Sequence, residues 1–312
     1  MTVARPLLVL LGPTASGKSA LGLFLAEKLN GEILACDSTQ VYRHFDIGTA
    51  KPTAAERART PHHLLDLCEP EEEFTAGDYL RLGRAALDDI CARGRLPIIV
   101  AGTGLYLRAL LEGLTPLPPR SPELRARLQA RAEEQGSGYL HRLLARVDPA
   151  SAKEIAPQDT PKLVRALEVF FIARRSRAEL FREGRPRLEG YTVEKIGLLG
   201  DRPQLYQRIE ARVDSMLAAG WLDEARRLRE RFGANLKPFG FLGYKQLAAH
   251  LRGEVTLEEA GKQIKQETRN LAKRQLTWFR REPGVNWLAG FGDHSGIQER
   301  ALARTRAAAV SR

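Results

Sequence analysis

The first third of the chain alternates between short continuous apolar runs and stretches with helical spacing. Leu7–Leu11 is an unbroken apolar run before a glycine, which is typical of a strand buried on both faces of a parallel sheet. Apolar residues then keep helical spacing over 20–29, and strand-like runs follow at 33–36 and 97–101. The last run leads through Gly102 into another helical stretch. This order predicts an α/β fold with a doubly wound parallel-sheet core.

The alternation stops in the proline-rich segment 115–119. From there to about Gly190 the pattern is that of helices separated by glycine and proline. We therefore predict an inserted all-helical domain over 115–190, and an α/β core formed by 1–114 and 191–290. Residues 291–312 are expected to be a C-terminal tail that the core does not need.

The pattern after the insert returns to that of the core. Residues 192–199 alternate like a strand, and Pro203 and Gly220 bracket the next helix. Thr256 and Glu259 have the spacing of a capping box, which predicts the start of a long helix. Apolar positions share one face of that helix, namely Ile264, Thr268, Leu271, Leu276 and Phe279.

Charge is unevenly distributed along the chain. The net charge is +11, and the predicted insert carries 15 Lys and Arg against 10 Asp and Glu. The segment Lys262–Arg281 has seven basic residues and one acidic residue, Glu267. Such a balance predicts binding to a polyanion, most simply a nucleic acid.

The remaining composition indicates the compartment. Three scattered cysteines, Cys36, Cys68 and Cys91, have neither zinc-site nor disulfide spacing. No apolar run has the length of a signal-peptide core or a membrane span, so no membrane association is expected. We expect a cytoplasmic protein in a reducing environment.

A glycine-rich loop follows the first strand and opens the first helix, which is the context of a phosphate-binding loop. Two glycines let backbone N–H groups point inward, a lysine adds a cation, and a serine offers a hydroxyl to Mg²⁺. No predicted strand ends in the Asp that usually holds the metal in nucleotide hydrolases. The loop therefore predicts a bound diphosphate, and leaves open whether phosphorus is attacked or the diphosphate leaves from carbon. Its residues are Gly12, Pro13, Thr14, Ala15, Ser16, Gly17, Lys18 and Ser19.

Asp37 comes directly after the second strand, so it should lie at the carboxyl edge of the sheet beside the phosphate loop. An Asp at this position can be a turn or capping residue, a metal ligand or a general base. Position in the chain does not separate these three roles.

Several motifs, in this order, resemble the bacterial tRNA dimethylallyltransferases, and the resemblance extends from about Leu7 to Trp287. The phosphate loop alone is common to many enzymes, whereas the second and third motifs together are specific to this family and its relatives. The motifs are Gly12 to Ser19, Asp37-Ser38-Thr39-Gln40-Val41-Tyr42-Arg43, Asp46-Ile47-Gly48-Thr49-Ala50-Lys51-Pro52, Pro61-His62-His63-Leu64, Gly102-Thr103-Gly104-Leu105-Tyr106, Arg165-Ala166-Leu167-Glu168-Val169, Gly243-Tyr244-Lys245 and the segment from Ala272 to Arg280.

The resemblance implies a specific reaction, which is transfer of a dimethylallyl group from dimethylallyl diphosphate to an adenosine of tRNA. The acceptor would be the exocyclic amine of the adenosine on the 3′ side of the anticodon. Asp37 would be the general base, and Thr14 would touch the reacting groups. Lys18, Arg212 and a Mg²⁺ ion held through Ser19 would stabilise the leaving diphosphate.

The resemblance also implies contacts with the anticodon stem-loop of tRNA, whose target adenosine the family flips out of the loop. We expect a monomer without an obligate protein partner. The residues expected to contact tRNA are Asp37, Ser38, Thr39, Gln40, Thr103, Arg125, Pro161, Lys162, Leu163, Val164, Arg165, Gly240, Phe241, Leu242, Gly243, Tyr244 and Lys245.

Three other functions fit parts of the sequence. A small-molecule kinase or NTPase would use the phosphate loop, but it lacks the strand-end Asp and has no need of a basic insert. A prenyltransferase acting on free adenine nucleotides would likewise leave the basic segments without a role. A non-enzymatic RNA-binding protein would account for the charge and leave Asp37 and the phosphate loop idle.

Overall fold

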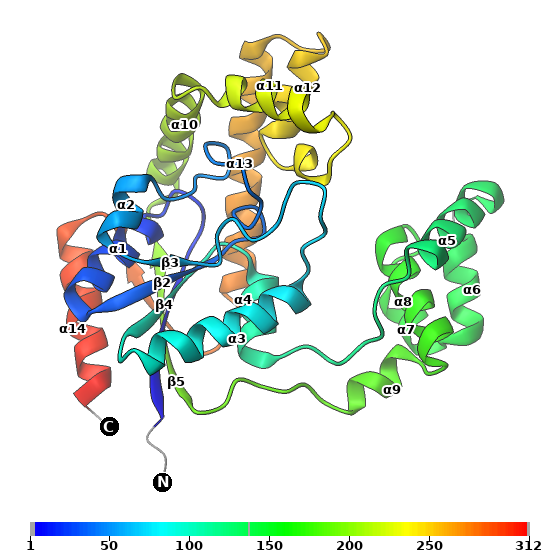
Figure 1. Ribbon diagram of the computed structural model, residues 1–312, viewed down its shortest axis with the longest axis horizontal. Helices are drawn as coiled ribbons and strands as arrows, with labels where there is room; N and C mark the ends of the chain where they lie inside the picture. Colours follow the sequence, from blue (N-terminus) through cyan, green and yellow to red (C-terminus); the bar gives the residue numbers. More distant parts are fainter. Residues whose placement is uncertain (1–3, 137, 311–312) are drawn as a thin grey trace. The chain divides into compact units, whose positions relative to one another are not determined.

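The computed structural model describes residues 4–136 and 138–310 (Figure 1). The chain forms two compact units. Unit 1 comprises Met1–Leu111 and Leu188–Arg312, and unit 2 comprises Glu112–Arg187. Unit 2 thus begins and ends three residues before the boundaries expected for the insert.

Unit 1 is built on one sheet of six strands that are all parallel, in the order β3-β2-β4-β1-β5-β6. The predicted parallel α/β core is confirmed, and four of the strands coincide with the predicted apolar runs. The strands are β1 (Arg5–Leu11), β2 (Gly31–Cys36), β3 (His62–His63), β4 (Leu96–Ala101), β5 (Tyr191–Leu199) and β6 (Val285–Ala289).

Helices cover both faces of this sheet, because side chains of each strand alternate between the two faces. Leu8 and Leu10 of β1 belong to the core on the side of α1 (Lys18–Leu29) and α14 (Ser295–Val310). The opposite core contains Leu7 and Val9 together with side chains of α3 (Ala76–Ala92), α4 (Gly104–Glu112) and α13 (Leu257–Phe279). The central strands are therefore shielded from water on both sides.

The remaining helices of unit 1 gather beyond the carboxyl ends of the strands. Pro203 lies in the first turn of α10, and Gly220, at φ 95°, lies between α10 and the next helix, as the sequence predicts. The helices are α2 (Ala54–Arg59), α10 (Arg202–Ala218), α11 (Trp221–Phe232), α12 (Tyr244–Leu251) and the 3₁₀ helix η1 (Lys237–Gly240).

Helix α13 starts at the predicted capping box. The Thr256 hydroxyl accepts a hydrogen bond from the Glu259 N–H, and the Glu259 carboxylate accepts one from the Thr256 N–H. These bonds satisfy N–H groups that a helix start otherwise leaves unpaired. Within the described residues, no helix combines the length and the apolar character that crossing a membrane requires.

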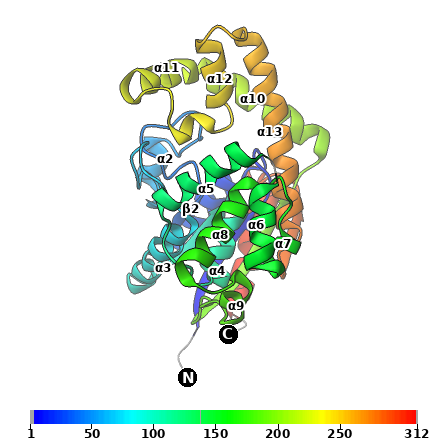
Figure 2. The same ribbon diagram turned by 90° about the vertical axis from the view of Figure 1, so that its right-hand side faces the viewer.

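Unit 2 is entirely helical, and Figure 2 shows α5, α6 and α8 lying side by side. Its core contains Leu128, Leu144 and Leu167 from these three helices. Asp148 and Asp159 cap the starts of α7 and α8, and each of these helices has a proline in its first turn, in agreement with the predicted separation of helices by proline. The helices are α5 (Pro122–Gln135), α6 (Tyr139–Val147), α7 (Pro149–Glu154), α8 (Thr160–Ala173) and α9 (Arg177–Arg182).

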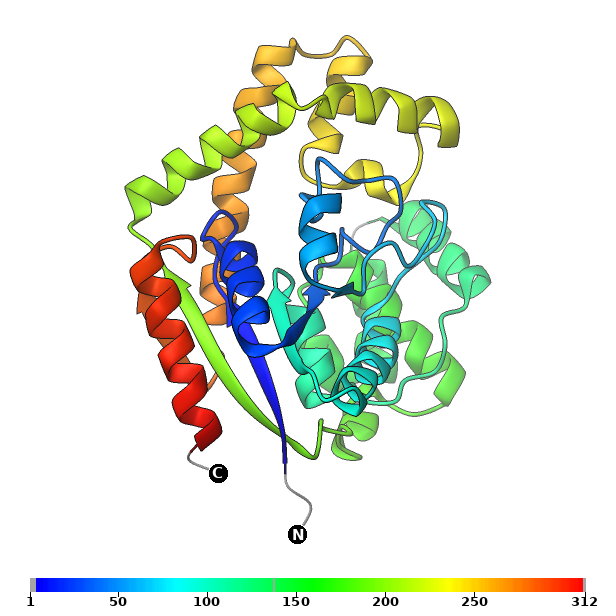
Figure 3. The same ribbon diagram turned by 60° about the vertical axis from the view of Figure 1, so that its left-hand side comes forward.

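The segment 291–312 differs from the tail expected from the sequence. It contains α14, which lies along α1 and β5 (Figure 3). Phe291, Ile297 and Ala301 are buried, and Ile297 belongs to the core beneath α1. The helix is rich in Ala and Arg, so its narrow apolar stripe gives little contrast in the sequence.

We expect Ile297→Ala to destabilise unit 1 by about 2–4 kcal/mol, because truncating a buried Ile leaves a cavity in the core. Ile297 is 6% exposed. Urea unfolding followed by circular dichroism measures this loss. Arg300→Ala, on the exposed side of the same helix, should change the free energy of unfolding by less than about 0.5 kcal/mol. Equal stabilities of the two variants would show that α14 is dispensable after all.

Candidate active site at the carboxyl edge of the sheet

The carboxyl ends of β1, β2 and β4 bring the phosphate loop, Asp37 and Gly102 to the same edge of the sheet. These residues line one cavity of about 650 Å³ within unit 1. Helices α10 and α13 supply its other walls. The residues that matter below are Thr14, Lys18, Ser19, Asp37, Gln40, Ala50, Gly102, Arg208, Arg212, Val213, Met216, Trp221, Leu271 and Gln275.

The phosphate loop is held in shape by segments far from it in the sequence. Gly17 has φ 86°, and a Cβ there would lie 2.6 Å from the Gly292 nitrogen, so both backbone and space require glycine. The Gly292 N–H donates to the Ser16 carbonyl at 2.9 Å. Arg208 donates to the Ala15 carbonyl at 3.0 Å and pairs with Asp293 at 2.8 Å. Sequence reasoning assigned no role to Arg208, Gly292 or Asp293.

Lys18 is 9% exposed, and its Nζ donates to the carbonyls of Gly12 and Pro13 at 2.8 Å each. Burial and, to a smaller extent, the nearby Arg212 charge lower the pKa of Lys18 to about 7, while the Asp37 charge opposes the shift. The structure therefore brings Lys18, Arg212 and Asp37 within electrostatic reach of one another.

Arg212 projects from α10 into the cavity. The pKa of Arg212 is lowered by burial of its guanidinium among protein atoms and raised by Asp37, although part of the side chain faces the open cavity. Lys18, Arg212 and Asp37 thus bring two cationic groups and one carboxylate close together, and a bound anion would balance their charge. The sequence itself offered no signal for Arg212 beyond the family resemblance.

Asp37 is fixed through one of its two carboxylate oxygens. Oδ1 accepts from the Thr39 N–H at 2.8 Å and from the Thr39 hydroxyl at 2.7 Å. Oδ2 lies against Gly102, where a Cβ would come within 2.5 Å of it. Asp37 therefore stabilises the turn through Oδ1, and Oδ2 accepts no hydrogen bond from the part of the chain that the structure describes.

The neighbours of Asp37 tie adjacent loops together. The Ser38 N–H donates to the Thr103 hydroxyl at 3.0 Å, which joins the ends of β2 and β4. The Gln40 amide donates to the carbonyls of Thr49 and Ala50 at 3.1 Å each. Ser38, Gln40 and Thr103, three residues that the resemblance assigned to tRNA, thus have polar groups with internal partners.

Gln275 on α13 is a site residue to which sequence reasoning assigned no role. Its Oε1 accepts from the Thr14 N–H at 2.8 Å, and its Nε2 donates to the Gly102 carbonyl at 2.9 Å. One side chain thus joins the phosphate loop to the strand end that touches Asp37. The only sequence signal is a polar residue one helical turn after Leu271, on the inward face of α13.

Glu224 on α11 was also not predicted. It is buried, and its carboxylate accepts from the N–H groups of Asp46, Ile47 and Gly48 at 3.1, 2.8 and 3.3 Å. The Tyr244 hydroxyl donates to the same carboxylate, and burial followed by the Glu224 charge raises the pKa of Tyr244. Tyr244 is fully buried, so its hydroxyl is a structural donor and is not offered to RNA.

The predicted tRNA residues of unit 2 fall into two groups. Pro161 and Lys162 are exposed, but Leu163 and Val164 are each 1% exposed and pack in the core of the unit. The inward face of α8 thus buries Leu163 and Val164, and contact of the segment Pro161 to Arg165 with tRNA stays a prediction.

Arg125 and Arg165 of unit 2 converge on one buried carboxylate. Glu168 is fully buried and lies 3.4 Å from Arg125 and 2.6 Å from Arg165. It also accepts from the Ser121 N–H at 2.7 Å. Both guanidinium groups are held in place and keep about a quarter of their side-chain surface exposed.

Two of the seven basic residues of the α13 segment are neutralised by acids of α10. Lys265 pairs with Asp214 at 2.7 Å, and Arg269 pairs with Glu210. The exposed positive charge is concentrated further along the segment, at Lys273, Arg274, Arg280 and Arg281. This part lies next to Gln275 and hence next to the cavity.

Metal ligands are few at this edge. The Ser19 hydroxyl belongs to an exposed residue that lines the cavity. Within the described residues, no group of three or more His, Cys, Asp and Glu could hold a metal ion. His62 and His63 have internal partners, the Thr60 carbonyl at 2.8 Å and Glu32 at 2.7 Å.

Comparison with known proteins gives consistent matches. The family model described as IPP transferase matches residues 40–282. The tRNA dimethylallyltransferases of Solibacter usitatus and Koribacter versatilis are 53% and 51% identical to the chain. Each match covers 96% of this chain, and it covers 97% of the Solibacter usitatus protein and 98% of the Koribacter versatilis protein.

Solved structures agree with these matches. A tRNA isopentenylpyrophosphate transferase from Bacillus halodurans has a TM-score of 0.70 at 37% identity, and the match covers 97% of each chain. A eukaryotic dimethylallyltransferase acting on tRNA has a TM-score of 0.83 at 28% identity, and the match covers 99% of this chain and 79% of that one.

The lowered pKa of Lys18 generates a prediction about proton uptake. With a pKa of about 7, Lys18 is mostly uncharged at pH 8, and a bound diphosphate favours its charged form. Binding of pyrophosphate at pH 8 should therefore take up about one proton more in the wild type than in Lys18→Met. Calorimetric titration in buffers of different ionisation enthalpy measures this difference. Equal uptake by both proteins would show that Lys18 is already charged before binding.

Proposed function

The chain belongs to the IPP transferase family, and we propose that it transfers a dimethylallyl group from dimethylallyl diphosphate to an adenosine of tRNA. The acceptor is the exocyclic amine of the adenosine on the 3′ side of the anticodon. The observation that carries this proposal is the convergence of a phosphate loop, two cations and a partly free carboxylate on one cavity. The names of the relatives support the same reaction.

The residues of the cavity suit substitution at carbon. The amine nitrogen forms a bond to the first carbon of the allyl group while the bond from that carbon to the diphosphate oxygen breaks. The diphosphate leaves with the bonding electron pair. Lys18, Arg212 and the N–H groups of the phosphate loop stabilise the charge that develops on it.

The proton of the attacking amine needs an acceptor, because the adenine amine is a poor nucleophile. Asp37 Oδ2 is suited to this role, since Oδ1 is occupied by Thr39 and fixes the carboxylate. Thr14 of the phosphate loop lines the same cavity, and its backbone N–H donates a hydrogen bond to Gln275.

A Mg²⁺ ion fits the Ser19 side of the loop. Mg²⁺ keeps several waters and needs only one or two protein ligands when phosphate oxygens supply the others. The exposed Ser19 hydroxyl is such a ligand. When bound, the ion would add positive charge at the leaving diphosphate.

Exposed basic side chains of the α13 segment and of unit 2 supply the positive surface that RNA binding requires. On α13 these include Lys273 and Arg274, and in unit 2 they include Lys162. Lys245 is exposed as well and follows the buried Tyr244. We propose that the chain works as a monomer in the cytoplasm, where its tRNA substrate is found.

The reaction is tested by incubating the protein with an unmodified anticodon stem-loop, Mg²⁺ and labelled dimethylallyl diphosphate. Label should enter the adenosine beside the anticodon, and a matched RNA with inosine there should stay unlabelled because inosine has no exocyclic amine. Labelling of free AMP in preference to the RNA would favour a nucleotide prenyltransferase. ADP formation from ATP without prenylated RNA would indicate a kinase or NTPase.

Replacing the base gives a second test. Asp37→Asn should lower the single-turnover rate by about 10²–10⁴, while the affinity for tRNA is kept because the amide oxygen can still accept from Thr39. Asp201→Asn is the matched control, since Asp201 also follows a strand but caps α10. A wild-type rate in Asp37→Asn would remove Asp37 from the chemistry.

A further inference from the structure

The residues of α10 that line the cavity change from charged to apolar along the helix. Arg208, Arg212 and Met216 line the cavity at intervals of one helical turn, so they lie on the same face of the helix. Arg208 contacts the phosphate loop at Ala15, and Met216 lies about 12 Å further along the helix axis. A ligand that binds the loop through its diphosphate and extends along α10 would therefore reach Met216 with its other end.

On the side of the first cavity, Met216 packs among apolar side chains. Val213 and Trp221 are buried beside it, and Phe241 and Leu242 line the same part of the cavity. An apolar chain bound there is removed from water, which favours its binding in proportion to the area covered.

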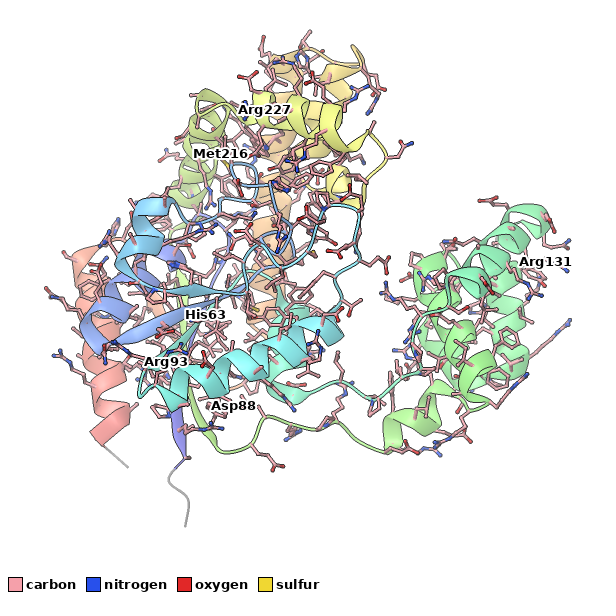
Figure 4. All side chains as sticks on the ribbon, in the orientation of Figure 1. His63, Asp88, Arg93, Arg131, Met216 and Arg227 are labelled. Carbon is pink, nitrogen blue, oxygen red and sulfur yellow. The ribbon has the colours of Figure 1, made fainter. Side chains whose placement is uncertain are left out.

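Met216 also lines a second cavity, of about 680 Å³. Both cavities share four lining residues, namely Ala50, Lys51, Pro52 and Met216. The wall between the two cavities is therefore formed by the Met216 side chain of α10 and by the short loop 50–52. Figure 4 shows Met216 on α10, beside the loop that precedes α2.

The loop part of this wall is rigid. Lys51 has 2% of its side chain exposed and is fixed by Asp46 at 2.8 Å and Asp66 at 2.5 Å. The Ala50 carbonyl accepts a hydrogen bond from Gln40. Met216 has no such restraint, because an unbranched thioether chain is held by packing alone. Truncating it therefore breaks no polar contact that the described residues make.

We propose that Met216 sets the upper length of the prenyl chain, admitting a five-carbon group and excluding a ten-carbon one. This inference rests on the proposed function. A longer allylic diphosphate would occupy the phosphate loop in the same way, and its additional isoprene unit would collide with Met216. Without that side chain, the additional unit would enter the second cavity past Ile47, Ala50 and Pro52.

The test compares dimethylallyl and geranyl diphosphate as donors to the same anticodon stem-loop RNA. Met216→Ala should raise the ratio of kcat/KM for the geranyl to the dimethylallyl donor by at least about tenfold over the wild type. Leu271→Ala is the matched control, because Leu271 lines the first cavity but not the second. It creates similar space without opening the wall, so its donor ratio should stay close to that of the wild type.

The possible results separate this inference from the proposed function. A wild type inactive with dimethylallyl diphosphate would refute the function itself. An unchanged ratio in an active Met216→Ala, or an equal rise in Leu271→Ala, would overturn the role of Met216. Loss of both activities in a folded variant would also overturn it, since Met216 would then support the reaction. If Met216→Ala does not fold, Met216→Val shortens the same side chain and must shift the ratio in the same direction.

Discussion

The shape of the phosphate loop is the constraint on which the site depends, and residues outside the loop maintain it. Gln275 binds the Thr14 N–H, Arg208 binds the Ala15 carbonyl, and Gly292 binds the Ser16 carbonyl. Buried backbone groups must find partners, and the loop supplies only some of them itself, through Lys18 and the Ser16 N–H. Helices α10 and α13 and the segment before α14 are therefore parts of the site as well as of the fold.

The charges of the site depend on the same arrangement. Lys18 is buried next to Arg212, and only the Asp37 carboxylate opposes the two positive charges. Burial and the Arg212 charge disfavour the charged form of Lys18 until an anion arrives, so the pKa of Lys18 in the free protein is lowered to about 7. On the proposed function, a bound diphosphate supplies the missing negative charge, and Lys18 takes up a proton when the diphosphate binds. The same cations then lie where the leaving group acquires its charge.

Sequence reasoning identified the parts of this site that are continuous in the chain. The strands β1, β2 and β4 are apolar runs that end in glycine or Asp, so the phosphate loop and Asp37 could be placed at one edge. The strand β3 has two residues and β6 mixes Asn with apolar residues, which leaves no pattern to read. The residues that fix the shape of the loops were not predicted, for a different reason. Arg208, Gln275 and Glu224 have the residue types of a solvated helix surface, and one sequence does not show which of them turn inward.

Helices α10 and α13 each serve one of the two proposed substrates. On the proposed function, Arg208, Arg212 and Met216 of α10 line the binding site of the prenyl diphosphate from its charged end to its apolar end. Helix α13 carries Gln275 and, just before it, the exposed Lys273 and Arg274, which on the proposed function belong to the surface that binds RNA. The two helices are joined by the ion pairs of Lys265 with Asp214 and of Arg269 with Glu210. Exposed pairs of this kind contribute at most about 1 kcal/mol to stability. Their consequence is geometric, because they join the two helices that supply Arg212 and Gln275 to the same cavity.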